Sequence, residues 1–144
     1  AVKELIDKGK NSIKVILPGT DSRNGYYQEM TKKLEIEQNI KFLGYRKDIP
    51  KLLKISNLYV STAKQEGLPV NLVEAMFSGL PIIATDCRGN RDVAEKLVNI
   101  DNINELYESI KKYINDEEKY ISSEITNKYK LKNIIKEMVK IYNV

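Results

Sequence analysis

The chain has 144 residues, of which 42% are apolar and 31% are charged. A chain of this length buries roughly 70% of its extended surface on folding, so we expect one domain with its own core. The composition is typical of a globular protein and excludes disordered and collagen-like chains. The apolar runs are only a few residues long, too short for a membrane span. The first ten residues read as the tail of an amphipathic helix, so no signal peptide is expected.

The charge distribution argues against a nucleic-acid partner. The formal net charge at pH 7 is +4, from 24 Lys and Arg against 20 Asp and Glu. Proteins that bind nucleic acids rely on Arg with interleaved aromatic residues. Here the cations are nearly all Lys spread over helix faces, which predicts an ordinary solvated surface.

The absence of His and of a second Cys excludes several kinds of catalytic and metal site. The chain has no His, which excludes Ser-His-Asp and Cys-His catalysis and the usual His-bearing zinc sites. Cys87 is the single cysteine, so there is no internal disulfide or CxxC pair, and a reducing, cytoplasmic compartment fits best. Catalysis would have to use carboxylates, Lys, Arg, Tyr, backbone amides or a bound cofactor.

Short apolar runs alternate with segments of helical spacing. The strands are predicted at 13–17, 40–43, 58–61, 81–84 and 97–100. The helices are predicted within 1–10 and at 26–36, 48–56, 69–78, 90–95, 104–114 and 122–142. This alternation predicts a parallel sheet with right-handed crossovers, and the nearly continuous apolar strands indicate helices on both faces. The predicted fold is therefore α/β: one Rossmann-like layer forming a single domain over residues 1–144.

Burial is predicted for two of these elements. The run 13–17 (IKVIL), which ends at Pro18-Gly19, is expected to be a buried strand. In the helix at 48–56, the residues expected to face inward are Ile49, Leu52, Leu53 and Ile55.

Four loops follow the carboxyl ends of the predicted strands, where open α/β sheets bind their ligands. They are rich in Gly, hydroxyl and charged residues, and they comprise residues 18–24, 44–48, 61–68 and 85–92. The functional question is what these loops hold.

The segment 61–81, STAKQEGLPVNLVEAMFSGLP, is the most informative. Glu66 falls in the loop, and Pro69 suits the first helical position, where its missing N–H costs nothing. Glu74 lies about five residues into the helix, roughly 7–8 Å further along the axis.

The helix N-terminus in this segment predicts a phosphate site. The amides of Gly67, Leu68 and Val70 are expected to be free there, at the positive end of the helix dipole. A ligand with phosphate in the middle and hydroxyls at both ends would suit this geometry, and a nucleotide-sugar is such a ligand.

The segment also resembles a known motif. Glu66 and Glu74 with seven residues between them, followed by Ala75-Met76 and Gly79-Leu80-Pro81, resemble the donor-site motif of retaining glycosyltransferases of the glycogen-synthase-like family (glycosyl transferases group 1). Those enzymes have two facing Rossmann domains, the GT-B fold. The resemblance runs from about residue 13 to 142 and covers the C-terminal, donor-binding half. Supporting stretches are VILPGTDS, NIKFLGYRKDI and PIIATDCRGNRD.

The resemblance implies a role for each matching residue. Glu66 would be the catalytic-site carboxylate that accepts hydrogen bonds from hydroxyls of the transferred sugar, and Glu74 would bind the ribose. The remaining substrate-binding positions would act mainly through the backbone: Gly67, Leu68 and Val70 on the diphosphate, Gly44, Tyr45 and Arg46 on the base, and Gly19 at a close approach to the donor.

The chain also departs from the family pattern. In the family, an Arg and a Lys after the domain's first strand neutralise the diphosphate. That strand, and the N-terminal acceptor domain, would precede residue 1. The fourth loop has Arg88-Gly89-Asn90 where two adjacent glycines are common, and Asp92 where Glu is usual. We expect the 144 residues to be the donor half of a longer enzyme that folds alone but does not turn over.

The resemblance implies retaining transfer of a hexose from a UDP-, GDP- or ADP-sugar to a hydroxyl acceptor, sugar or lipid-linked. The reaction would serve cell-surface polysaccharide or glycolipid synthesis. No cofactor or metal is expected, because the chain has no Asp-x-Asp motif. The alternative is a non-catalytic nucleotide-binding module of the same fold. An inverting transferase or an epimerase fits less well without His. The C-terminal Lys-rich helix is either a solvated face or a peripheral contact with the inner face of the cell membrane.

Overall fold

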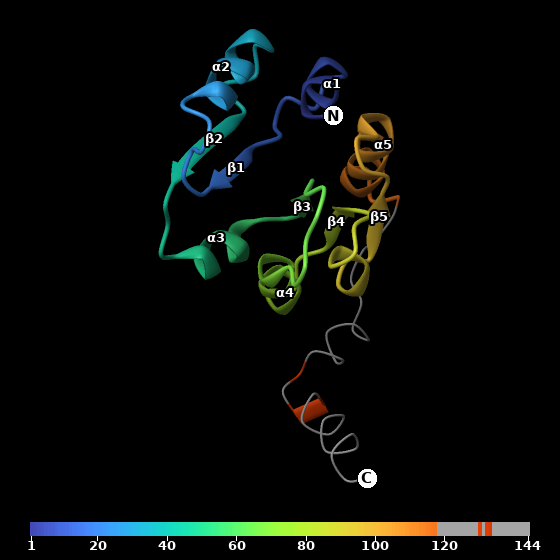
Figure 1. Ribbon diagram of the computed structural model, residues 1–144. Helices are drawn as coiled ribbons and strands as arrows, with labels where there is room; N and C mark the ends of the chain where they lie inside the picture. Colours follow the sequence, from blue (N-terminus) through green and yellow to red (C-terminus); the bar gives the residue numbers. More distant parts are fainter. Residues whose placement is uncertain (118–129, 131, 134–144) are drawn as a thin grey trace, which may run out of the picture.

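The computed structural model describes residues 1–117, 130, 132 and 133 (Figure 1). The strands are β1 (Val15–Pro18), β2 (Ile40–Gly44), β3 (Tyr59–Ser61), β4 (Ile82–Thr85) and β5 (Lys96–Val98). The helices are α1 (Val2–Asp7), α2 (Tyr26–Lys33), α3 (Ile49–Ile55), α4 (Val70–Phe77), the 3-10 helix η1 (Asn90–Asp92) and α5 (Ile103–Ile114). The strands and the other helices expected up to residue 114 are therefore confirmed, with shifts of a few residues at the ends, whereas the short helix expected at 90–95 is a 3-10 helix over 90–92. The helix expected over 122–142 falls almost wholly outside the described residues.

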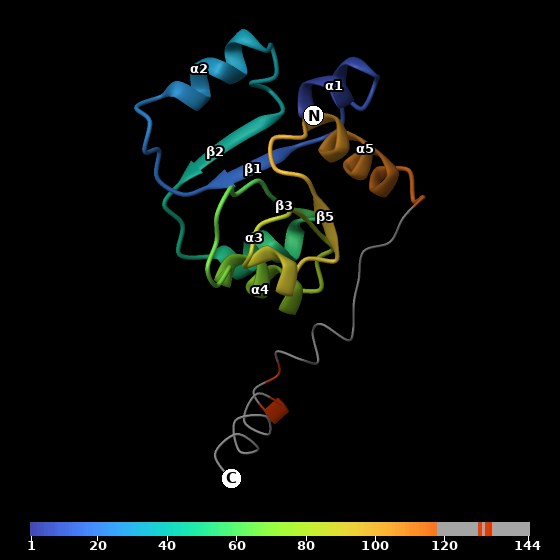
Figure 2. The ribbon, with the colours of Figure 1, turned by 45° about the vertical axis from the view of Figure 1, so that its right-hand side comes forward.

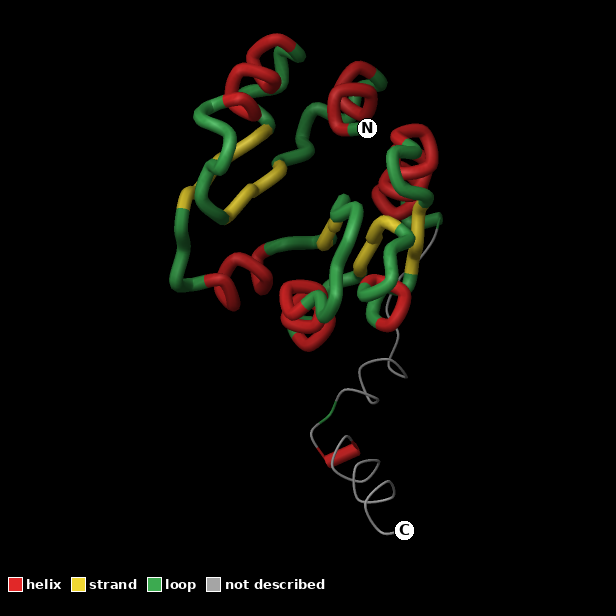
Figure 3. Tube along the Cα trace, viewed as in Figure 1, coloured by secondary structure: helices red, strands yellow, loops and turns green. Residues whose placement is uncertain are grey.

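The strands form two parallel sheets rather than the single continuous layer that the sequence predicted. β1 pairs with β2, and β4 lies between β3 and β5. Figures 1 and 3 show the two sheets apart, with β1 and β3 on the sides that face each other, and Figure 2 shows β1 and β2 side by side. In the Rossmann strand order 3-2-1-4-5-6, the described strands fit every position except the one between β1 and β3. A further strand at that position, preceding residue 1, stays a prediction.

One core lies between the three-stranded sheet and the helices α3 and α4 (Figure 1). Leu72 and Ala75 of α4 are completely buried, as is Ile82 on β4. Leu53 of α3 and Val93 close the same cluster. This face fixes how α4 sits on the sheet.

The opposite face of the same sheet packs against α5 and α1. Ile83 on β4, Val98 on β5 and Leu5 on α1 are buried there together with Tyr107 and Ile110. Neighbouring residues of β4 thus point to opposite faces, as the pleat requires. Helices cover both faces of this sheet, as the sequence predicted. None of the helices among the described residues has the length and apolar character of a membrane span.

Two expectations about burial are wrong. Ile55 was expected to face inward, but its exposed fraction is 75% because it is the last residue of α3, where the helix leaves the core. The strand at 13–17 was expected to be buried, but Leu17 is 42% exposed. The physical reason is that the two large clusters form around β3, β4 and β5, and neither β1 nor β2 has a fully buried residue.

We expect Leu72→Ala to lower the free energy of unfolding by about 2–5 kcal/mol, because it leaves a cavity in the α4 core. Urea unfolding followed by circular dichroism measures this loss. Ile55→Ala is the matched control, since its exposed side chain predicts a change within about 0.5 kcal/mol. Equal losses in the two variants would contradict the assignment of the core.

Candidate functional site

The Glu66 loop, which we define as residues 62–69 between β3 and α4, differs in one detail from the sequence prediction. α4 begins at Val70, and Pro69 is its N-cap, with φ −79° and ψ 77°, rather than its first helical residue. The Val70 N–H donates to the Leu68 carbonyl at 2.9 Å, forming an inverse γ-turn around Pro69. The Val70 amide, expected to be free, is therefore engaged within the loop.

The other two amides are free as predicted. The N–H groups of Gly67 and Leu68 donate no hydrogen bond to any part of the chain that the structure describes. Both residues are exposed, Leu68 at 69%. Since they lie just before α4, they add two unsatisfied donors to the positive end of its dipole. An anion is the ligand that this end of the helix favours.

The two carboxylates lie on either side of this helix start. Glu66 is half-buried in the loop, and Glu74 is exposed as the fifth residue of α4. Both act on Tyr59 of β3, whose pKa is raised above its ordinary value of 10.0. Burial is the main cause, a hydrogen bond with Asn71 opposes it, and the charges of Glu74 and Glu66 add to it. Tyr59 is therefore a neutral phenol within electrostatic reach of both carboxylates.

Tyr59 and Asn71 were not identified from the sequence. Tyr59 was predicted only as part of the strand at 58–61, and Asn71 only as part of the helix at 69–78. The signal that could have found them is their position. Asn71 is the second residue of α4, close behind the Glu66 loop, and Tyr59 is the first residue of β3, the strand that leads into this loop.

A mostly apolar recess adjoins Glu74. Its volume is about 250 Å³, and its lining comes from one face of α4 and from α3. The lining residues are Pro50, Leu53, Val70, Val73, Glu74, Phe77 and Ser78. The α4 residues among them include the spacing i, i+3, i+4, i+7, so they form one stripe along the helix. Glu74 is the charged group of this stripe.

Gly19 and Gly44 meet at the carboxyl ends of β1 and β2. The Gly19 N–H donates to the Gly44 carbonyl at 2.8 Å, next to a register shift between Leu17 and Pro18. Gly19 has φ +129° and Gly44 has φ +62°, conformations that side chains strongly disfavour. The structure thus brings these two predicted residues together at the end of the β1–β2 sheet. Glu66 and Glu74 lie instead beside the sheet that contains β3.

The loop after Gly44 is exposed and braced by an ion pair. Tyr45 is 73% exposed. Arg46 binds Asp48 with two hydrogen bonds, from Nε at 2.8 Å and from Nη2 at 2.7 Å. This pairing raises the pKa of Arg46 and lowers the pKa of Asp48. The Arg46 side chain is therefore engaged within its own loop, and this loop offers a ligand its backbone and the Tyr45 ring.

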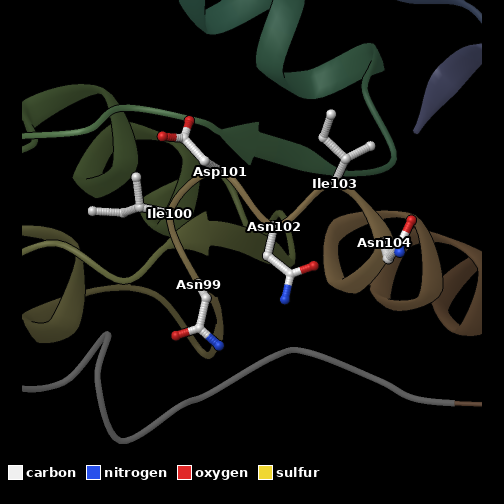
Figure 4. A pocket seen from close by; sticks show the side chains of 6 residues that line it. All are labelled: Asn99, Ile100, Asp101, Asn102, Ile103 and Asn104. Carbon is white, nitrogen blue, oxygen red and sulfur yellow. The ribbon is translucent and has the colours of Figure 1, made fainter.

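A second hollow, of about 540 Å³, lies where β5 leads into α5 and is lined by residues 99–104 (Figure 4). Its polar groups are largely engaged in capping α5: Asn102 accepts from the Glu105 N–H at 3.0 Å, and Glu105 accepts from Asn99 Nδ2 at 2.9 Å. Figure 4 shows the side chains spreading away from the turn rather than converging. None of the predicted site residues lines this hollow.

Sequence comparisons identify related proteins. The family model described as glycosyl transferases group 1 matches residues 1–133. A glycosyltransferase of Methanocaldococcus jannaschii is 36% identical over 99 residues, which make up 68% of this chain and 24% of that protein. The poly(ribitol-phosphate) alpha-N-acetylglucosaminyltransferase of Staphylococcus aureus is 28% identical over 156 residues, covering 99% of this chain and 31% of that protein.

A solved structure shares the fold. HepE of Anabaena, determined in complex with UDP, matches with a TM-score of 0.79 and 25% identity, over 98% of this chain and 43% of that one. This match confirms the predicted α/β fold class. The chain spans between 24% and 43% of the length of these three proteins.

We expect Asp48 to titrate below its ordinary pKa of 3.8, chiefly because of its bidentate hydrogen bonds with Arg46. Because folding lowers this pKa, the pair stabilises the fold above the ordinary value, and its contribution is lost as the pH falls through the folded value. In Arg46→Gln, carboxyl NMR titration should show the Asp48 pKa moving back towards 3.8. Asp21 is the control, since its lowered pKa comes mainly from the backbone N–H groups of Arg23 and Gly25. An unchanged Asp48 titration would contradict the pairing.

Proposed function

The chain belongs to the glycosyl transferases group 1 family and corresponds to the C-terminal domain of its GT-B enzymes, and from this premise we propose that it binds the nucleotide-sugar donor. The observation that carries the proposal is the start of α4. There, two free amides, of Gly67 and Leu68, lie between the carboxylates of Glu66 and Glu74. Since the chain spans 24% of one relative and 31% of another, the acceptor site belongs to a longer protein that contains this chain.

The nucleoside end of the donor lies beside Glu74 in this proposal. The Glu74 carboxylate accepts hydrogen bonds from the ribose hydroxyls, and the adjoining apolar recess gives the sugar ring or base a surface to pack on. Gly44, Tyr45 and Arg46 contact the base, mainly through the backbone, and Gly19 lets the main chain approach the donor closely. The engaged Arg46 side chain favours backbone recognition there, and the exposed Tyr45 ring adds a surface for the base.

The diphosphate lies at the N-terminus of α4. The Gly67 and Leu68 amides point their dipoles at it, and the helix adds its positive end. The Val70 amide, which belongs to the γ-turn, contributes when that turn opens to the ligand. Cations outside residues 1–144 complete the neutralisation of the leaving group.

Glu66 faces the sugar. In the reaction, the bond between the anomeric carbon and the diphosphate oxygen breaks, and the acceptor oxygen bonds to that carbon on the same face. The acceptor proton leaves with the nucleoside diphosphate, so the products are a retained glycoside and a nucleoside diphosphate. Glu66 holds the hexose hydroxyls during this transfer, and contacts that strengthen in the transition state raise the rate.

Relatives indicate the biological setting. One is named for acting on poly(ribitol-phosphate) and another for acting on a diphosphoundecaprenol-linked sugar, which supports a role in cell-surface polysaccharide or glycolipid synthesis. HepE was solved with UDP, so UDP is the first nucleotide to test, with GDP and ADP as the other candidates. The buried single Cys87 fits a cytoplasmic protein; contact with the membrane's inner face is the remaining proposal.

We expect Glu74→Ala to weaken nucleotide and nucleotide-sugar binding alike by about 1.5–3 kcal/mol, the range for hydrogen bonds to a charged group. Isothermal calorimetry with UDP, GDP, ADP and their sugars measures the change and identifies the base. Glu29→Ala on α2 is the matched control, because Glu29 is another exposed helical glutamate. Unchanged binding in Glu74→Ala would remove Glu74 from the site.

We expect Glu66→Ala to leave free nucleotide binding nearly unchanged but to lower transfer sharply in the full-length enzyme, because its contacts are to the sugar. Steady-state kinetics with the donor identified by calorimetry measures this. A non-catalytic nucleotide-binding module would show the Glu74 effect without the Glu66 effect. Small, equal losses at both positions would mean that both carboxylates are surface residues.

A further inference from the structure

Gly89, in the loop between β4 and η1, lies directly against the backbone of the Glu66 loop. A Cβ atom added at position 89 would lie 2.9 Å from the Glu66 carbonyl oxygen and 3.0 Å from the Gly67 carbonyl carbon, and closer still to the Gly67 oxygen. Gly89 has φ −70° and ψ −31°, which any residue adopts without strain. The contact, and not the backbone conformation, is therefore what requires glycine here.

Hydrogen bonds hold the same loop at two points. The Gly89 N–H donates to the Glu66 carbonyl at 3.1 Å. At the end of β4, the Thr85 hydroxyl donates to the Ala63 carbonyl. Thr85 and Gly89 are both buried, so water competes little for these bonds. The Glu66 loop is thus held at two points, at Ala63 by Thr85 at the end of β4 and at Glu66 by Gly89 in the loop that follows β4.

Asn90, the first residue of η1, holds the end of β4 that carries Thr85. Its side chain is completely buried, and its Nδ2 donates to the Thr85 carbonyl at 2.9 Å. Its Oδ1 has no hydrogen-bond partner in the described part of the chain. The Asn90 amide therefore ties the start of η1 to Thr85, and so to the strand end that carries the hydroxyl.

We propose that Thr85 and Gly89 are positioning residues for the transfer reaction, forming a clamp that fixes the Glu66 loop against the end of β4. The proposal rests on the proposed function, because the clamp matters for transfer only if Glu66 and the neighbouring amides bind the donor. The clamp holds the backbone of Glu66 and Gly67 and so sets where the Glu66 carboxylate and the Gly67 and Leu68 amides point. Its hydrogen bonds reach Ala63 and Glu66 and, among the described residues, none reaches Glu74, so it governs the sugar and diphosphate end of the donor.

The principal test is Gly89→Ala in the full-length enzyme. We expect kcat to fall on the order of 10²-fold, the cost of a misplacement of about 1 Å. The donor KM should rise by a smaller factor, because the Gly67 and Leu68 amides shift while Glu74 keeps its contacts. Turnover is followed as release of nucleoside diphosphate from the nucleotide-sugar. The calorimetric stoichiometry of nucleoside diphosphate binding counts folded molecules, so loss of folded protein is not mistaken for loss of kcat. An unchanged kcat per binding site would overturn the proposal.

Variants of Thr85 test the second contact of the clamp, and a variant of Cys87 is the matched control. Thr85→Val keeps the shape but removes the hydroxyl that bonds Ala63, so kcat should fall, and Thr85→Ser should restore it. Cys87→Ala changes a small buried side chain of the same loop that takes no part in the clamp, so its kcat should match the wild type. A Thr85→Val enzyme as active as the wild type, or an equal loss in Cys87→Ala, would overturn the clamp.

A ligand-free measurement separates the clamp from the proposed function. Hydrogen exchange of the residue 89 amide should be slow in the wild type, because this N–H is buried and bonded to Glu66, and faster in Gly89→Ala and Thr85→Val. A wild-type protein that binds none of UDP, GDP and ADP would contradict the proposed function. The exchange rates of the residue 89 amide would still decide whether the clamp exists. Equal exchange in the three proteins would overturn the clamp even if transfer were observed.

Discussion

The packing of α4 against β4 is the interaction on which the candidate site depends. Leu72, Ala75 and Met76 form its inward stripe, and all three are buried. With 3.6 residues per turn, this stripe forces Val70, Glu74 and Phe77 to the outer side of the helix. The same packing fixes where the helix begins, and so where its positive end and the two free amides lie. The carboxylate, the apolar recess and the anion site therefore follow from one buried face.

Much of this could be predicted from the sequence because it depends on local patterns. The spacing of apolar residues gave the strands and helices to within a few residues, and the segment from Glu66 to Glu74 located the start of α4. The engagement of the Val70 amide could not be predicted, because it depends on how the backbone turns around Pro69. The proximity of Tyr59 to both glutamates could not be predicted either, since it arises from the packing of α4 against β3.

The division into two sheets has a consequence for the candidate site. Gly19 and Gly44 lie at the end of the β1–β2 sheet, whereas Glu66, Gly67 and Glu74 lie at the end of the sheet that contains β3. Parallel strands present their carboxyl ends on one edge of a sheet, and nucleotides bind in the crevice at that edge where the strand order reverses. The donor in our proposal bridges the two sheets, so its affinity depends on how firmly they are held relative to each other. Sequence patterns carry no information about this long-range arrangement, because each strand pairs only within its own sheet.

Asn90 shows that local stability was not the sole constraint on the loop after β4. A buried polar atom without a partner costs about 1–3 kcal/mol, and Asn90 Oδ1 is such an atom within the described residues. An apolar side chain of similar size would avoid that cost, but it would also lose the Nδ2 bond that holds the Thr85 carbonyl. Since Thr85 in turn holds Ala63, the amide supports the position of the Glu66 loop at the expense of stability. The Asn90 amide therefore helps to hold the segment that carries the Glu66 carboxylate and the two free amides.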